Sequence, residues 1–265
     1  MRMKIKITAT ALLALIIVFM SQGLYGVSPK LIIIEGGTFI MGSDEAGERE
    51  QPAHTVTVSS FLMSESEVTQ NMWNEVMDDN PSRLKGESLP VERITWMMAI
   101  EFCNGLSLKE GLEPFYIITD EGVQADWSKN GYRLPTEAEW EFAAKGGNKS
   151  QGLQFAGSDT IDEVAWHKEN SRFKTHHVKE KKANELGLYD MSGNVYEWCW
   201  DWFGETYYAD SPAQDPKGPE TGERKILRGG CWYSEARNSV IAARVHADPN
   251  GQGANVGFRV CRNLP

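Results

Sequence analysis

The sequence predicts an α+β fold built from short helices, short strands and long loops. Three segments place apolar residues at helical spacing, and several short runs alternate or end at turn residues. Nine Trp and 25 Gly among 265 residues favour an aromatic-rich core crossed by turns rather than by long helices. No linker and no repeat divides the chain beyond its N-terminal segment, so we expect a single domain over residues 27–265.

The N-terminal segment, residues 1–26, has the pattern of a secretory signal peptide. Arg2, Lys4 and Lys6 precede the apolar run Thr8–Met20, and small residues follow. A transmembrane anchor is the alternative, but the run is short for one. No Cys lies near the expected cleavage region, so the usual lipoprotein attachment site is missing. We expect export to the cell surface or periplasm, and the mode of membrane association stays open.

The overall charge narrows the class of partner. The formal net charge of −10 argues against nucleic acid and against anionic membrane surfaces as ligands. With 41% hydrophobic and 24% charged residues the chain has ordinary globular composition. We expect a monomer.

Three predicted helices each begin at a threonine that can accept a hydrogen bond from the first turn. They span residues 67–77, 95–108 and 136 to about 146, with N-caps at Thr69, Thr95 and Thr136. Thr136 and Glu139 have the spacing of a capping box.

The third helix carries Glu137, Glu139 and Glu141. An acid/base pair is one interpretation, but carboxylates in a first turn suit the helix dipole. We therefore expect capping and a solvated face.

Strands are expected where short runs alternate. Leu31–Ile34, residues 38–42 and His54–Phe61 are examples, and in the last Val56 and Val58 share the buried face. A hairpin is expected from residue 115 to the region around Trp127. In residues 198–202, tryptophans at every second position predict one core-facing side, formed by Trp198, Trp200 and Trp202.

The cysteines and histidines give weak signals. The four cysteines, Cys103, Cys199, Cys231 and Cys261, allow three complete disulfide pairings, and a Cys231–Cys261 bridge would close a loop. We favour the alternative that all four are small buried hydrophobes. The histidines show no zinc spacing, and the adjacent His176 and His177 are expected to be solvated. The sequence contains no nucleophile elbow, P-loop or dinucleotide fingerprint.

The C-terminal stretch, residues 228–262, differs from the rest. It opens with a strand and Gly229-Gly230 and closes with a strand over 256–260, while its interior follows neither a helical nor a strand period. Pro249-Asn250-Gly251 predicts a turn. Loops on a rigid frame commonly carry binding function, so we expect the contact surface here.

Ordered motifs over nearly the whole mature chain resemble the formylglycine-generating-enzyme (sulfatase-modifying factor) family. They are Gly36–Gly42, Glu67–Thr69, Pro90-Val91, Arg133–Glu141, Gly187–Asn194, Arg228–Gly230 and Gly257–Arg259. The resemblance implies a C-type-lectin-like core elaborated with long loops. The family's oxidases bind copper through two Cys after the Arg-Gly-Gly motif, and those positions are Ser234 and Ser239 here. A hydroxyl does not replace a thiolate as a soft copper ligand, so we expect no catalysis.

The C-terminal stretch also resembles the variable region of proteins diversified by retroelements. The matching framework is Arg228-Gly229-Gly230, Trp232, Ala242, Arg244, Pro249 and Gly257-Phe258-Arg259. Mutation of the adenines in an Asn codon can produce codons for residues such as Tyr, Ser and His, but not for Trp, Glu or Gln. Trp232, Glu235 and Gln252 are therefore expected to belong to the unvaried scaffold. The candidate ligand contacts are Tyr233, Ser234, Ala243, Val245, His246, Asp248 and Asn250. An ordinary family member with drifted loops is the alternative.

The resemblance further implies a structural calcium site, with Asn194 and Glu197 as its ligands. The alternative roles are a turn for Asn194 and a strand end for Glu197. Together the patterns predict an exported ligand-binding display protein without catalysis, whose unidentified ligand is expected to be a protein. An oxidase of the formylglycine-generating type and an enzyme accessory protein are the alternatives.

Overall fold

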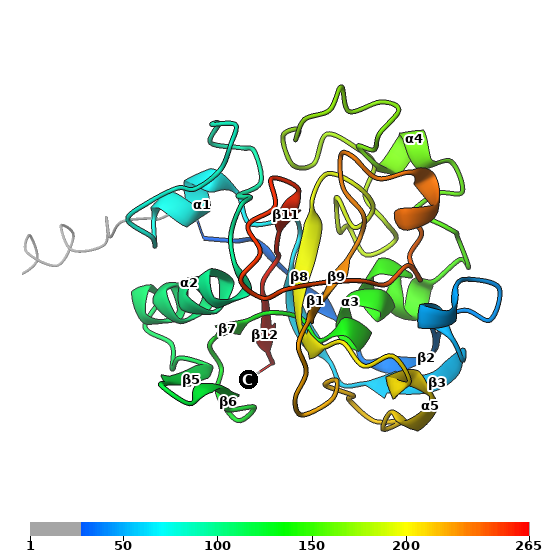
Figure 1. Ribbon diagram of the computed structural model, residues 1–265, viewed down its shortest axis with the longest axis horizontal. Coiled ribbons are helices and arrows are strands. Elements are labelled where there is room, and N and C mark those ends of the chain that lie inside the picture. Colours follow the sequence, from blue (N-terminus) through cyan, green and yellow to red (C-terminus); the bar gives the residue numbers. More distant parts are fainter. Residues whose placement is uncertain (1–27, 265) are drawn as a thin grey trace, which may run out of the picture.

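Two four-stranded sheets form the centre of the molecule in the computed structural model, which describes residues 28–264 (Figure 1). The predicted signal peptide lies outside the described residues. The first sheet is antiparallel, in the order β1 (Leu31–Ile34), β4 (Phe61–Ser64), β12 (Cys261–Asn263) and β7 (Tyr132–Arg133). The second has the order β10 (Val245–Ala247), β9 (Lys225–Arg228), β8 (Tyr196–Trp202) and β11 (Val256–Gly257), and only its β8–β11 pair is parallel.

Short elements surround these sheets. Two hairpins pair β2 (Gly37–Met41) with β3 (His54–Val58) and β5 (Tyr116–Thr119) with β6 (Gly122–Ala125). The α-helices are α1 (Gln70–Asn74), α2 (Trp96–Lys109), α3 (Glu137–Ala144), α4 (Ile161–Val164) and α5 (Tyr207–Asp210). Single 3₁₀ turns are η2 (Glu48–Glu50), η3 (Gly147–Lys149) and η4 (Ala236–Asn238). This mixture confirms the predicted loop-rich α+β fold.

The predicted N-caps are all formed. Thr69, Thr95 and Thr136 accept hydrogen bonds from the third residue of α1, α2 and α3, and the capping box at Thr136 is complete. The first helix begins later than predicted because Val68 forms backbone hydrogen bonds with other segments. Its N–H donates to the carbonyl of Phe258, and its carbonyl accepts from Val91. These tertiary hydrogen bonds keep residues 67–69 outside the helix.

The β8–β9 pair is buried on both faces. Trp198 and Leu227 face the cluster that contains α2, whereas Cys199 and Ile226 face the cluster that contains Trp140 of α3. Figure 1 accordingly shows α2 and α3 on the two sides of these strands. Because side chains alternate along a strand, this pair joins the two hydrophobic clusters into one interior.

The predictions for the cysteines and for the tryptophans can each be compared with the structure. All four cysteines are free and buried, as expected of small hydrophobes. The tryptophan row keeps the predicted common face but not the predicted burial, since Trp198 is fully buried whereas Trp200 and Trp202 are partly exposed. Both outer tryptophans pack against Trp96, so the three side chains stay on one side of the strand despite the register shift between Trp198 and Trp202. No helix among residues 28–264 is long and apolar enough to cross a membrane.

Candidate functional site

The C-terminal stretch leaves the sheet through a turn that requires glycine. Gly229 and Gly230 follow β9 with φ of +93° and +80°. A Cβ on Gly230 would lie 2.2 Å from the hydroxyl of Ser239. Only glycine fits this approach, so the turn fixes where the loop after β9 begins.

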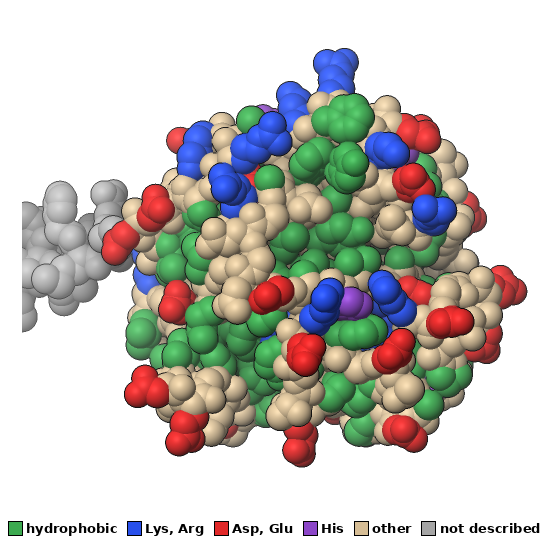
Figure 2. Space-filling model, viewed as in Figure 1, with side chains coloured by type: hydrophobic (Ala, Val, Ile, Leu, Met, Phe, Trp, Pro, Cys, Tyr) green, Lys and Arg blue, Asp and Glu red, His purple; other side chains and the backbone are tan. Residues whose placement is uncertain are grey.

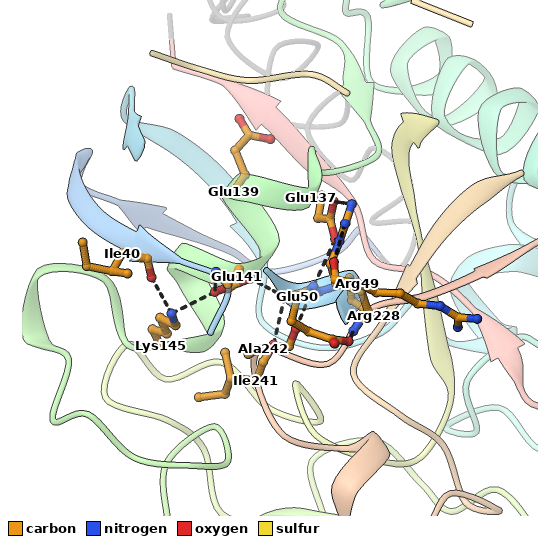
Figure 3. A network of polar contacts seen from close by, with 12 residues as sticks. Ile40, Arg49, Glu50, Glu137, Glu139, Glu141, Lys145, Arg228, Ile241 and Ala242 are labelled. Carbon is orange, nitrogen blue, oxygen red and sulfur yellow. Dashed lines mark hydrogen bonds and ion pairs between the residues drawn. The ribbon is translucent and has the colours of Figure 1, made fainter. Parts of the chain in front are cut away.

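Buried ion pairs hold this stretch against α3 (Figure 3). Arg228 donates to Glu137 at 3.0 Å and to Glu141 at 2.6 Å. Arg244 donates to both oxygens of Glu137, at 2.7 and 2.8 Å. The expectation of a solvated glutamate face on this helix is therefore wrong, because arginines far along the chain cover it.

Each remaining buried arginine also has its own carboxylate. Arg133 contacts both oxygens of Glu139 at 2.7 Å, and Arg259 contacts both oxygens of Glu197 at 2.6 and 2.7 Å. Burial alone would raise the pKa of Glu141, but Arg228 and Lys145 hold that pKa below its ordinary value. These carboxylates are structural ion-pair partners of the buried arginines.

The two residues predicted to bind calcium do not fit that role. Glu197 is completely buried, and its oxygens accept from Arg259 and from the indole of Trp140. The Asn194 oxygen accepts from the His176 backbone N–H, and its amide nitrogen donates to Glu67. A guanidinium already occupies the position beside Glu197 that a cation would need. Asn194 and Glu197 are therefore structural.

The copper positions of the oxidases hold hydroxyl groups that are engaged or enclosed. Ser234 accepts from the Cys231 backbone N–H and donates to the Tyr196 hydroxyl. Ser239 is fully buried against Gly230. Burial raises the pKa of the Cys261 thiol well above its ordinary value. The residues present do not fit a copper–thiolate centre.

The predicted ligand contacts divide by exposure. Tyr233 is 57% exposed, and Asp248 and Asn250 are also exposed. Ala243, Val245 and His246 are partly buried. Ser234 is buried, which removes its side chain from the surface.

The three residues expected to be scaffold differ in exposure. Trp232 is partly buried and donates its indole N–H to the carbonyl of Ala254. Glu235 and Gln252 are exposed, so their assignment to the scaffold depends on the codon argument alone and stays a prediction.

The strand β10 sends its residues to two faces. Val245 packs with the cluster around α2, whereas His246 lies against Phe203, with ring centroids 4.1 Å apart. Burial and the charges of Arg49 and Arg224 lower the pKa of His246. The predicted contacts on this strand therefore do not form one surface.

An open groove of about 1350 Å³ runs beside β10. Ala243 and Val245 line it together with residues 42, 43 and 45–52 and with Arg237. The buried Arg244 lies between them and donates to the carbonyl of Arg49 at 2.7 Å. The groove therefore borders the ion-pair network directly.

One part of this surface is not predicted from the sequence. Phe173 is 59% exposed and lies near Tyr233, with ring centroids 6.3 Å apart. Exposed Arg172 and Lys174 flank it, and we call Phe173, Tyr233, Arg172 and Lys174 the aromatic patch. Hydrophobic and basic side chains gather at the top of the viewed face in Figure 2, over the loop between α4 and β8.

The loop that presents Phe173 has an unusual backbone. Arg172 and Phe173 both have φ of +55°, which L-residues rarely adopt. His176 supports the loop by stacking on Trp166 at 3.8 Å and contacting the Ser171 carbonyl. His176 is thus not solvated as expected. The sequence of this polar segment gives one local indication that Phe173 is exposed, namely a single Phe among charged residues.

Comparison with known proteins places this geometry in context. The Sulfatase-modifying factor enzyme 1-like domain matches residues 23–264. The chain is 42% identical to Chaperone protein LppX of Paenibacillus barcinonensis, covering 89% of this chain and 90% of that protein. It is 40% identical to the formylglycine-generating enzyme of Streptomyces coelicolor, over 54% of this chain and 50% of the enzyme.

Among solved structures, Treponema denticola variable protein 1 superposes with a TM-score of 0.83 at 37% identity. The superposition covers 88% of this chain and 95% of that chain. A likeness of this extent confirms the C-type-lectin-like fold that the motifs imply.

Removing one partner from the ion-pair network should be costly. We expect Arg244→Met to lower the free energy of unfolding by about 3–5 kcal/mol, because Glu137 would keep a poorly compensated buried charge. Lys129→Met, which breaks the exposed pair with Glu113, should leave the free energy of unfolding nearly unchanged because solvent screens that pair. Urea unfolding measures both, and equal costs for the two variants would contradict this view of the network.

Proposed function

The chain belongs to the sulfatase-modifying factor enzyme 1-like family, and we propose that it is a non-catalytic member that binds a protein partner through its C-terminal surface. The aromatic patch carries this proposal. Two large aromatic side chains, Phe173 and Tyr233, are more than half exposed beside basic groups. Aromatic residues and arginine dominate the binding energy of protein interfaces.

The backbone of the patch supports a binding role. Arg172 and Phe173 adopt left-handed conformations, which cost free energy and persist only where the surroundings enforce them. Here the Ser171 hydroxyl bonds to the carbonyl of Trp232 at 2.6 Å, tying the loop to the C-terminal stretch. A loop held in this way presents Phe173 with little further loss of entropy on binding.

Two serine residues support the proposal that the protein is not catalytic. Ser234 and Ser239 stand where the family's oxidases are expected to carry copper-binding thiols, and both are buried inside the protein. A fold hosts a chemistry only if its site residues are present.

Export and diversification complete the proposal. The likeness to a protein named as variable supports a display role in which Tyr233, Asp248 and Asn250 differ between copies of the protein. The N-terminal pattern supports display at the cell surface or in the periplasm. Exposed substitutions usually change stability by about 0.5 kcal/mol or less, so these positions tolerate exchange.

A second candidate function is assistance to a partner enzyme during folding or maturation. The 42% identity to a protein named as a chaperone favours it. Such a role also needs an exposed aromatic surface, but its client would be non-native. Light scattering separates the two candidates, because only a chaperone suppresses aggregation of a chemically unfolded client diluted into the protein.

Truncating the aromatic patch should weaken binding. We expect 12-residue peptides selected by phage display on the wild-type protein to lose about tenfold or more in affinity for Phe173→Ala and Tyr233→Ala, roughly 1.4 kcal/mol. Ile117→Ala removes a side chain that is 52% exposed elsewhere and serves as the matched control. Selected peptides that bind all three variants equally would refute the assigned surface.

Copper loading should not produce oxidase activity. We expect no aldehyde when the copper-treated protein is incubated with a peptide of the form Cys-x-Pro-x-Arg, since a serine hydroxyl does not hold copper as a thiolate does. Mass spectrometry of the peptide measures the outcome. Turnover that disappears in a Cys231→Ser, Cys261→Ser double variant would establish the oxidase alternative instead.

Diversification should leave a trace in the coding locus. We expect a second copy of the segment that encodes residues 228–262, differing only at adenines and adjacent to a reverse transcriptase. Sequencing the locus tests this directly. If the segment has no second copy, the loops are fixed, and any binding function is specific to one partner.

A further inference from the structure

A small pocket walled by tryptophans lies on the opposite face of β9 from His246. It has a volume of about 220 Å³, and Trp96, Trp200, Trp202 and Lys225 are among the residues that line it. Lys225 pairs with Ala247 across the sheet, whereas His246 pairs with Ile226. Since neighbouring residues of a strand face opposite ways, the pocket is separate from the surface around His246.

The ammonium group of Lys225 sits among three indole rings. It lies 4.0 Å from the ring centroid of Trp96, 4.8 Å from that of Trp200 and 3.7 Å from that of Trp202. Its one hydrogen bond to residues 28–264 is to the carbonyl of Trp200, at 2.7 Å. An ammonium has three N–H donors, so it retains capacity for a further acceptor.

Lys225 also lacks a counter-charge. Within residues 28–264 it forms no ion pair, although the residue is only 1% exposed. The nearby carboxyl of Asp201 is a poor partner, because burial and the neighbouring Glu137 raise its pKa to about 8. Burial in turn lowers the pKa of Lys225 to about 7. A buried ammonium without a carboxylate is costly unless a ligand supplies one.

We propose that this pocket binds a small carboxylate carrying one ring, with the carboxylate on the Lys225 ammonium and the ring against the indoles. The volume is below the roughly 300–1,000 Å³ typical of sites for drug-sized ligands, which limits the ligand to about one ring. Aromatic walls with a few placed polar or charged groups are the usual composition of a small-molecule site. Val123 and residues 217–220 complete the lining, and Lys217 and Glu220 add one charge of each sign.

Binding can be measured by calorimetry, with intrinsic tryptophan fluorescence as a second signal. We expect saturable binding of benzoate or glucuronate in the millimolar range or tighter, and the stronger of the two identifies an aromatic or a sugar ring. Benzamide, glucose and acetate lack either the charge or the ring, and each should bind at least about tenfold more weakly, a difference of ~1.4 kcal/mol. Failure of both ring carboxylates to saturate would overturn the proposal, as would equal binding of their neutral analogues.

Two variants and one control connect binding to the pocket. Lys225→Met should weaken binding about tenfold or more, whereas Lys149→Met, at an exposed lysine away from the pocket lining, should leave it unchanged. If Lys225→Met fails to fold, Trp202→Leu tests the ring wall at a partly exposed position and should weaken binding similarly. Undiminished binding in the variant that folds would refute the site.

The pH dependence gives an independent readout. A carboxylate ligand requires the protonated amine, so affinity should fall as the pH rises above about 7, the pKa of Lys225. The other ionisable groups facing the amine are Asp201 on β8 and Lys217 and Glu220 at the pocket lining. Phe173→Ala should not alter benzoate or glucuronate binding, which separates this site from the proposed partner surface.

Discussion

The structure depends on one buried carboxylate, that of Glu137, which binds two arginines at once. Arg228 ends the strand from which the C-terminal stretch departs, and Arg244 immediately precedes β10, to which it returns. Two points of the loop are thereby fixed to the first turn of α3. Because each of these charges would be costly alone, the helix, the strand and the loop are stable only together. The groove beside β10 owes its shape to this arrangement.

Local patterns in the sequence predicted local structure well. The threonine caps, the inward face of β3 and the buried cysteines each depend on residues close in the chain or on side-chain type. The α+β class follows from these signals, and the C-type-lectin-like fold from the ordered motifs. The ion pairs could not be predicted in the same way, because Arg228 and Glu137 are 91 residues apart. Carboxylates in a first helical turn also have a sufficient local explanation.

The candidate site was predictable only in outline. The glycine turn that opens residues 228–262 was predictable, but the exposure of each side chain depends on tertiary contacts. The Ser234 hydroxyl accepts a hydrogen bond from the backbone N–H of Cys231, and its side chain is buried. Phe173 is exposed on a backbone with positive φ, which the amino-acid composition of the segment does not indicate. Glu197, expected at a metal, instead neutralises Arg259. Polar residues in a motif can thus be structural even where related proteins use similar positions differently.

The alternation of β10 has a consequence for how variation in this region would be sampled. Consecutive residues of this strand point to opposite sides of the sheet. A library randomised at both Val245 and His246 would therefore vary the side that packs on the α2 cluster and the side that contacts Phe203 at the same time. Any one ligand would experience only part of that combinatorial diversity. Substitutions on the other side of the strand would not change the affinity for that ligand and could differ freely between clones. Effective repertoire size would therefore be smaller than the number of sequences.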